Sequence, residues 1–138
     1  MKSIRSLLLG AFLLSGLANA AGIEGKWRTT DDKTGKPKAV VQISKSASGY
    51  QGKIIYLEQG VENLCPACKD KRPLVGLTVL TGLQEKGKEY TDGKIFDPKG
   101  GKTYQAKAEL SADGKTLKVR GFLGISALGR TQTWKRVD

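Results

Sequence analysis

The chain has 138 residues, of which 24 are Lys or Arg and 13 are Asp or Glu, so its formal net charge is +11 at neutral pH. It contains no histidine. Without an imidazole, Ser-His-Asp and Cys-His machinery and most zinc hydrolase sites are excluded. The remaining carboxylates, such as Asp31, Asp32, Glu85 and Glu89, lie in predicted turns and are expected to be solvated. We therefore expect a protein that is not an enzyme and that needs no cofactor or metal.

The first 20 residues have the three parts of a secretory signal peptide. Lys2 and Arg5 supply positive charge, an apolar run extends from Leu7 to Leu17, and Ala18-Asn19-Ala20 is a small-residue cleavage site. The apolar run is about half of the roughly 20 residues that a membrane-spanning helix needs. We expect cleavage after Ala20, a periplasmic location, no membrane span, and a single mature domain over residues 21–138 whose charge, without the two signal cations, is +9.

The two cysteines form a C-x-x-C motif, Cys65-Pro66-Ala67-Cys68. Outside the cytoplasm such a pair usually closes into a disulfide, so a structural staple is the first interpretation. Thiol-redox activity is the alternative, because Lys69, Lys71 and Arg72 would lower a thiol pKa. Redox pairs normally open a helix, whereas the residues around this motif are typical of a loop.

Beyond the signal, short runs of β-forming residues alternate with turn residues, a pattern typical of a sandwich or barrel. From Tyr104 to Leu110, apolar and polar residues alternate, which indicates an antiparallel sheet with one buried and one solvated face. Eight antiparallel strands can close into an up-and-down barrel and so leave no exposed edge. The predicted strands are Gly25–Thr30, Lys38–Lys45, Tyr50–Glu58, Val75–Leu83, Tyr90–Phe96, Thr103–Ser111, Thr116–Leu123 and Thr131–Val137.

The sequence carries two family resemblances. Gly25-Lys26-Trp27 resembles the G-x-W start of lipocalins, whose tryptophan packs across the closed end of the barrel against an arginine from near the end of the chain. The resemblance therefore predicts that Arg130 packs against Trp27. An all-β, lipocalin-like barrel of eight strands after a signal peptide is therefore expected.

The second resemblance is to a bacterial exported family catalogued as domain of unknown function 2147. It rests on Gly93–Pro98, Gly101–Tyr104, Leu117–Gly121 and Gly129–Trp134, together with the G-x-W and a central C-x-x-C followed by Pro73 and Gly76. The resemblance implies a lipocalin-like barrel in the envelope of a Gram-negative bacterium, and it implies no established activity.

Three functions follow from these observations. The first is a binding module for a small hydrophobic or amphipathic, lipid-like ligand inside the barrel. The second is an interaction protein that docks anionic lipid or glycan of the envelope through its basic surface, although the even scatter of lysines along the sequence favours solubility. The third is thiol-redox chemistry at Cys65 and Cys68. We expect a monomer that does not bind nucleic acid. The candidate ligand-binding residues are Trp27, Tyr56, Tyr104, Arg120, Arg130, Gln132 and Trp134.

Overall fold

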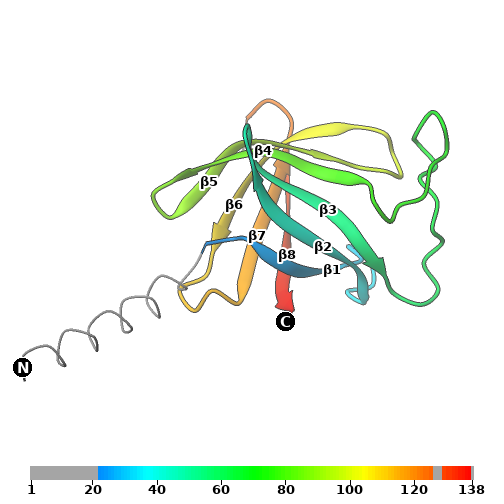
Figure 1. The fold of residues 1–138 in the computed structure, drawn as a ribbon, viewed down its shortest axis with the longest axis horizontal. Helices are drawn as coiled ribbons and strands as arrows, with labels where there is room; N and C mark the ends of the chain where they lie inside the picture. The colour runs from blue at the N-terminus through cyan, green and yellow to red at the C-terminus, as the bar shows by residue number, and fades with distance from the viewer. Residues whose placement is uncertain (1–21, 126–128, 138) are drawn as a thin grey trace, which may run out of the picture.

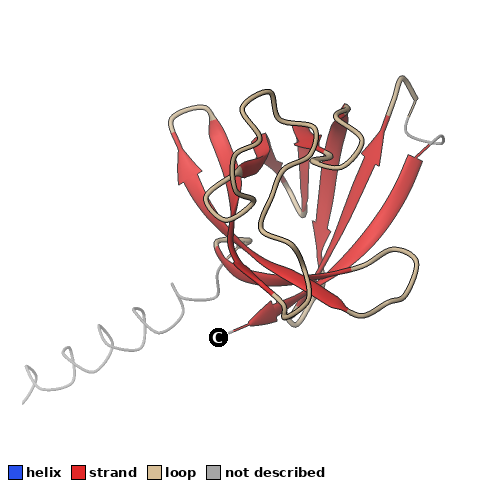
Figure 2. Ribbon diagram, turned by 90° about the vertical axis from the view of Figure 1, so that its right-hand side faces the viewer, coloured by secondary structure: helices blue, strands red, loops and turns tan. Residues whose placement is uncertain are grey.

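The computed structural model describes residues 22–125 and 129–137, and all eight predicted strands are present in it (Figure 1). Over these residues it contains strands, turns and loops and no helix (Figure 2), and thus no helix that could cross a membrane. The strands are β1 (Gly25–Thr30), β2 (Pro37–Ser46), β3 (Gly49–Leu57), β4 (Thr78–Lys86), β5 (Glu89–Phe96), β6 (Thr103–Leu110), β7 (Thr116–Phe122) and β8 (Gly129–Val137).

Each strand pairs antiparallel with the next, and β8 returns to β1, so the sheet is a closed eight-stranded barrel. The up-and-down order places alternate connections at opposite ends. One end, here called the N-terminal end, carries residues 22–24 and the turns β2–β3, β4–β5 and β6–β7. The other, here called the disulfide end, carries the connections β1–β2, β3–β4, β5–β6 and β7–β8. The predicted fold class is confirmed.

The start of β4 was predicted wrongly. The strand begins at Thr78 rather than at Val75, because Gly76 adopts a left-handed backbone with φ of 99° and the Leu77 N–H bonds back to the Leu74 carbonyl. Only glycine takes this conformation without a steric cost. Residues 74–77 therefore form a turn, but this turn still exchanges backbone hydrogen bonds with Ile54 of β3.

The core lies inside the barrel and follows the alternation that the sequence predicted. Ala106 and Ala108 of β6 are buried and pair with inward-facing positions of β7, of which Val119 is also buried. In the same way, Ile43 and Leu80 belong to one row of inward side chains that crosses β2, β3 and β4. The middle of the barrel is filled by these side chains, as an eight-stranded barrel allows.

The barrel closes over a short seam. The β1–β8 ladder has three residue pairs, from Lys26 opposite Val137 to Arg28 opposite Lys135, whereas the β7–β8 ladder has seven. All three pairs lie towards the N-terminal end. Towards the disulfide end, β8 extends past its last pair with β1, and its side chains contact Asp32 in the β1–β2 connection.

Candidate functional site

Trp27 closes the N-terminal end of the barrel. Its side chain is fully buried, and its indole Nε1–H donates a hydrogen bond of 2.9 Å to the Ile23 carbonyl. The guanidinium of Arg136 lies over the ring at 4.4 Å from the centroid. The resemblance assigned this contact to Arg130, and that assignment is wrong: Arg136 is the residue opposite Trp27 in the β1–β8 register, and Arg130 lies six residues away along β8.

Arg136 also ties the start of the chain to the barrel. Its guanidinium donates hydrogen bonds to the carbonyls of Gly22, Glu24 and Gly114 at 2.7 to 2.9 Å. Hydrogen bonds from a charged donor are stronger than neutral ones. One side chain thus fixes the segment that crosses this end and the β6–β7 turn beside it.

Two buried tyrosines complete the closure. Tyr50 and Tyr90 make an edge-to-face contact with ring centroids 5.5 Å apart. Burial raises the pKa of both phenols, and the negative charge of Glu85 raises it further. Both phenols are therefore neutral near pH 7, and this end of the barrel is an apolar plug.

The inner surface is different at the disulfide end. Ile95, Tyr104 and Gln132 face the interior, because they pair with or alternate with buried inward residues, yet each remains partly exposed. Inward residues in the middle of the barrel, such as Leu80 and Val119, are at most 2% exposed. Solvent therefore reaches the inner wall at the disulfide end and not farther down.

A chain of polar contacts runs along this inner wall. The Trp134 indole donates to the Gln132 side-chain oxygen at 2.9 Å, and the Gln132 amide donates to the Asp32 carboxylate at 2.8 Å. Arg130 forms an ion pair with the same carboxylate at 3.2 Å. Asp32 lies in the β1–β2 connection, so it bridges β1 to β8 beyond the short seam. The guanidinium side chain is 75% exposed, which leaves Arg130 accessible at the rim.

Two of the predicted ligand residues lie outside the barrel. Tyr56 pairs with Val40, which pairs with Arg28, so all three share the face opposite to Trp27, and Tyr56 is 50% exposed. Arg120 alternates with the buried Val119, and its guanidinium donates to the Thr131 hydroxyl at 2.8 Å. Placing Arg120 and Tyr56 at a mouth or lumen was wrong, since strand alternation directs both outward.

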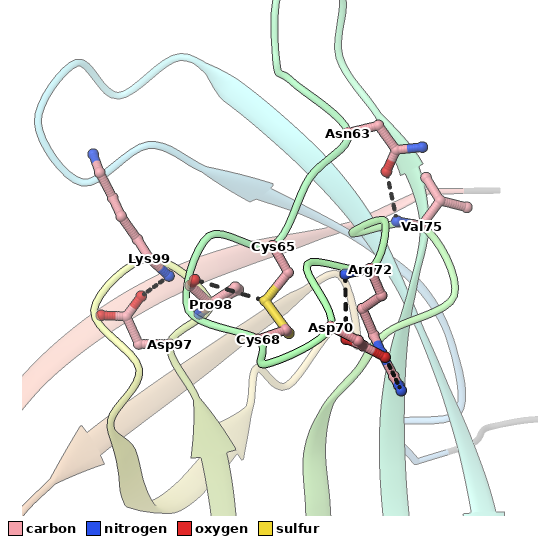
Figure 3. The surroundings of a disulfide bond; sticks show 9 residues. All are labelled: Asn63, Cys65, Cys68, Asp70, Arg72, Val75, Asp97, Pro98 and Lys99. Carbon is pink, nitrogen blue, oxygen red and sulfur yellow. Dashed lines mark hydrogen bonds and ion pairs between the residues drawn. A yellow bond between two sulfur atoms is a disulfide. The ribbon is translucent and has the colours of Figure 1, made fainter.

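The predicted disulfide is present, between Cys65 and Cys68, in the long β3–β4 connection (Figure 3). This connection packs against the β5–β6 turn: the Ala67 N–H donates to the Pro98 carbonyl, and the fully buried Cys65 lies against the same carbonyl. The residues after Cys68 form turns. The motif therefore lacks the helix N-terminus that lowers a thiol pKa in redox proteins.

Two surface hollows lie elsewhere. One of about 630 Å³ opens at the N-terminal end, between the β4–β5 and β6–β7 turns, and is lined in part by Glu85, Glu109, Lys88 and Lys118. Another of about 180 Å³ lies on the outer wall beside Arg120. Both carry charges of both signs, which does not suit an apolar ligand. Among the described residues, no group of three Cys, Asp or Glu side chains could hold a metal ion.

The structure thus divides the predicted site. Arg130, Gln132 and Trp134 are linked through polar contacts that run along β8 from the disulfide end into the barrel. Tyr104 faces the interior at the disulfide end, Trp27 lies at the opposite end, and Tyr56 and Arg120 lie outside. Sequence reasoning missed Asp32, Ile95 and Arg136. Arg136 follows Trp134 at the same strand parity, a signal that could have identified it. Asp32 was interpreted as solvated turn surface, and the sequence carries no signal of its contacts across the seam.

Comparisons with known proteins agree with this architecture. No curated protein matches the chain. A solved structure described as protein HP1028 from the human pathogen Helicobacter pylori, which belongs to the lipocalin family, is similar with a TM-score of 0.71 and 20% identity, over 86% of this chain and 84% of that one. At this identity the likeness shows the fold alone. The model of a family described as uncharacterized proteins conserved in bacteria, DUF2147, matches residues 25–136. The chain belongs to this DUF2147 family, and its own fold is a lipocalin-like barrel.

Proposed function

We propose that this protein is a non-enzymatic binding protein that holds a small hydrophobic or amphipathic molecule at the disulfide end of its barrel. The observation that carries the proposal is the partial exposure of inward-facing Ile95, Tyr104 and Gln132. Such a surface offers apolar contact together with a few fixed polar groups, the combination that small-molecule sites use.

The chemistry of the inner wall indicates how a ligand would be oriented. An apolar portion would lie against Ile95 and the Tyr104 ring, where burial yields about 25 cal/mol per Å². A polar head would meet the exposed Arg130 guanidinium at the rim, beside its ion-pair partner Asp32. The amphipathic character of the ligand follows from this juxtaposition of apolar wall and exposed cation.

The test compares two tyrosines. Binding of the fluorescent probe 1-anilinonaphthalene-8-sulfonate to the purified protein should weaken about tenfold, equivalent to about 1.4 kcal/mol, in Tyr104→Ala. The matched control is Tyr56→Ala, which removes the same side chain from the outer face and should leave the affinity unchanged. Equal effects of the two substitutions, or a protein that binds no probe and retains no lipid detectable by mass spectrometry, would show that the barrel holds no such ligand.

We infer further that the protein is exported to the periplasm and loses residues 1–20. The support is the charged, apolar and small-residue pattern of the first 20 residues, together with a cysteine pair suited to an oxidising compartment. N-terminal sequencing of protein released from the periplasm of expressing cells should begin at Ala21. Recovery of the intact chain from the cytoplasm would contradict export.

A further inference from the structure

The positive charge of this protein is concentrated on one side of the barrel. Strands β7, β8, β1, β2 and β3 are contiguous in the closed sheet and together carry ten Lys or Arg residues and no acidic residue. Strands β4, β5 and β6 carry three Lys residues and four acidic residues. The lysines that are evenly scattered along the sequence are thus segregated in space, and the interpretation of the charge as general solubility does not describe the folded surface.

Five of the cations on the outer wall form a group that is here called the basic face. They alternate along their strands with residues that point into the barrel. The basic face comprises Lys26, Arg28, Lys53, Arg120 and Lys135.

The strand register brings cations of the basic face close together. Arg28 lies directly opposite Lys135, an arrangement of like charges that destabilises a sheet. Lys26 is two residues from Arg28, and Lys53 lies in the Lys26 row with only Gln42 between them. Glu58, just after the end of β3, lies 3.6 Å from Arg28, and Glu89 and Glu109 line the hollow beside Arg120. Binding of an anionic surface would relieve the repulsion that remains.

Exposed apolar side chains border the same face towards the disulfide end. Tyr56, which is 50% exposed, shares the outer row of Arg28, and Leu123 and Ile125, which are 49% and 63% exposed, follow β7 just beyond Arg120. Aliphatic side chains gain free energy in hydrocarbon but gain little against sugars or phosphates. Cations beside exposed apolar residues are therefore the composition of a surface that lies on a membrane.

We propose that the basic face docks this protein onto an anionic phospholipid membrane, with the cations at the headgroups and Leu123 and Ile125 inserted at the edge of the acyl region. A soluble polyanion would use the cations and leave the two aliphatic side chains in water. The proposal does not depend on a ligand in the barrel, because the cations of the basic face lie on the outer wall.

The first experiment measures co-sedimentation of the protein with vesicles of phosphatidylglycerol in phosphatidylcholine. The triple substitution Lys26→Gln, Lys53→Gln and Lys135→Gln should lower the partition coefficient on the order of a hundredfold, since each cation near an anionic surface contributes about fivefold. The matched control, Lys86→Gln, Lys88→Gln and Lys94→Gln, removes the same charge from the opposite wall and its turn, and should lower the coefficient far less. All six lysines are exposed, so both proteins should keep the parental melting temperature.

A second experiment separates a membrane from a soluble polyanion. Leu123→Ser with Ile125→Ser should weaken vesicle binding and leave binding to a heparin fragment unchanged. Binding should also fall when the salt is raised to about 1 M, where the Debye length shrinks to about 3 Å. Equal losses in the two lysine triples, equal binding to pure phosphatidylcholine, or heparin binding with no effect of the serine substitutions on vesicles would each overturn the proposal.

Discussion

The two ends of the barrel differ in how they are closed. At the N-terminal end, Trp27 is fully buried, its indole is hydrogen-bonded, and Arg136 satisfies three backbone carbonyls while it covers the ring. At the disulfide end, a covalently braced connection and a partly exposed ion pair lie beside inward residues that solvent reaches. The N-terminal end thus contributes most to stability, whereas the disulfide end gives access to the interior. Substitutions at the first should change chiefly the free energy of unfolding, and substitutions at the second should change chiefly ligand binding.

The largest effect is expected at the closed end. Trp27→Ala removes a fully buried large aromatic side chain and should lower the free energy of unfolding by about 3–5 kcal/mol. Urea denaturation followed by far-UV circular dichroism measures this loss. A loss below about 1 kcal/mol, the size typical of a surface substitution, would mean that Trp27 does not hold that end together.

The two arginines of β8 provide the next comparison. Arg136→Gln removes hydrogen bonds to three carbonyls and the contact with Trp27, and should cost about 2–3 kcal/mol of stability. Arg130→Gln removes an exposed ion pair, which typically contributes at most about 1 kcal/mol. Both proteins can be measured in the same urea titration. If Arg130→Gln cost more than Arg136→Gln, the assignment of the closing arginine would return to Arg130.

The disulfide should stabilise its own connection more than the whole barrel. Cys65→Ala with Cys68→Ala opens a four-residue loop, for which chain entropy predicts a loss of about 2 kcal/mol. Hydrogen exchange should increase chiefly between Glu58 and Leu77. A reduction potential below about −300 mV would mark the bond as structural, whereas a higher value together with thiol-exchange activity would favour the redox alternative.

The polar contacts at the disulfide end should each contribute modestly. Gln132→Leu leaves the Trp134 indole N–H without the acceptor seen in the structure, and should cost about 1–2 kcal/mol. The fluorescence of Trp134 should change at the same time, because its hydrogen-bond partner is lost. Gln132→Glu retains an acceptor for the indole and is the control for fluorescence alone, since it also places a second carboxylate beside Asp32. Unchanged fluorescence in Gln132→Leu would argue against the contact in solution.

The smallest effect concerns pH at the closed end. Burial holds the pKa of Tyr50 and Tyr90 above the ordinary value of 10.0, so the folded barrel retains the phenolic protons more tightly than the unfolded chain does. The stabilisation is fully present below pH 10.0 and is lost as pH rises through the folded pKa values. Urea midpoints between pH 9 and 11 should fall, and the fall should be smaller in Tyr90→Phe.

Much of the fold was accessible from the sequence because local signals mark it. Alternation predicted the inward set of β6 correctly, and glycine and aspartate in the turns placed most strand ends within two residues. The start of β4 was wrong, because a β-rich run concealed the left-handed Gly76. The alternation of apolar and polar residues predicts which face of the sheet a side chain occupies. It does not reveal a turn that lies inside an apolar run.

The site was less accessible because it depends on register and on strand order in space. Arg130 and Arg136 have the same parity on β8, and only the β1–β8 register places Arg136 against Trp27. The contacts of Asp32 require the β1–β2 connection to cross the seam. Likewise, the basic face cannot be identified in a linear sequence, since its strands come from both ends of the chain and meet only when the barrel closes.

The short seam between the first and last strands also has a consequence for folding kinetics. The contact between Trp27 and Arg136 joins residues that lie near opposite ends of the chain, so its formation carries a large loop-closure entropy. During synthesis, β1 has no partner on one edge until β8 is made, and the unpaired edge is open to wrong pairing. Barrel closure is therefore the step at which this chain is most exposed to aggregation and at which a chaperone would help it most.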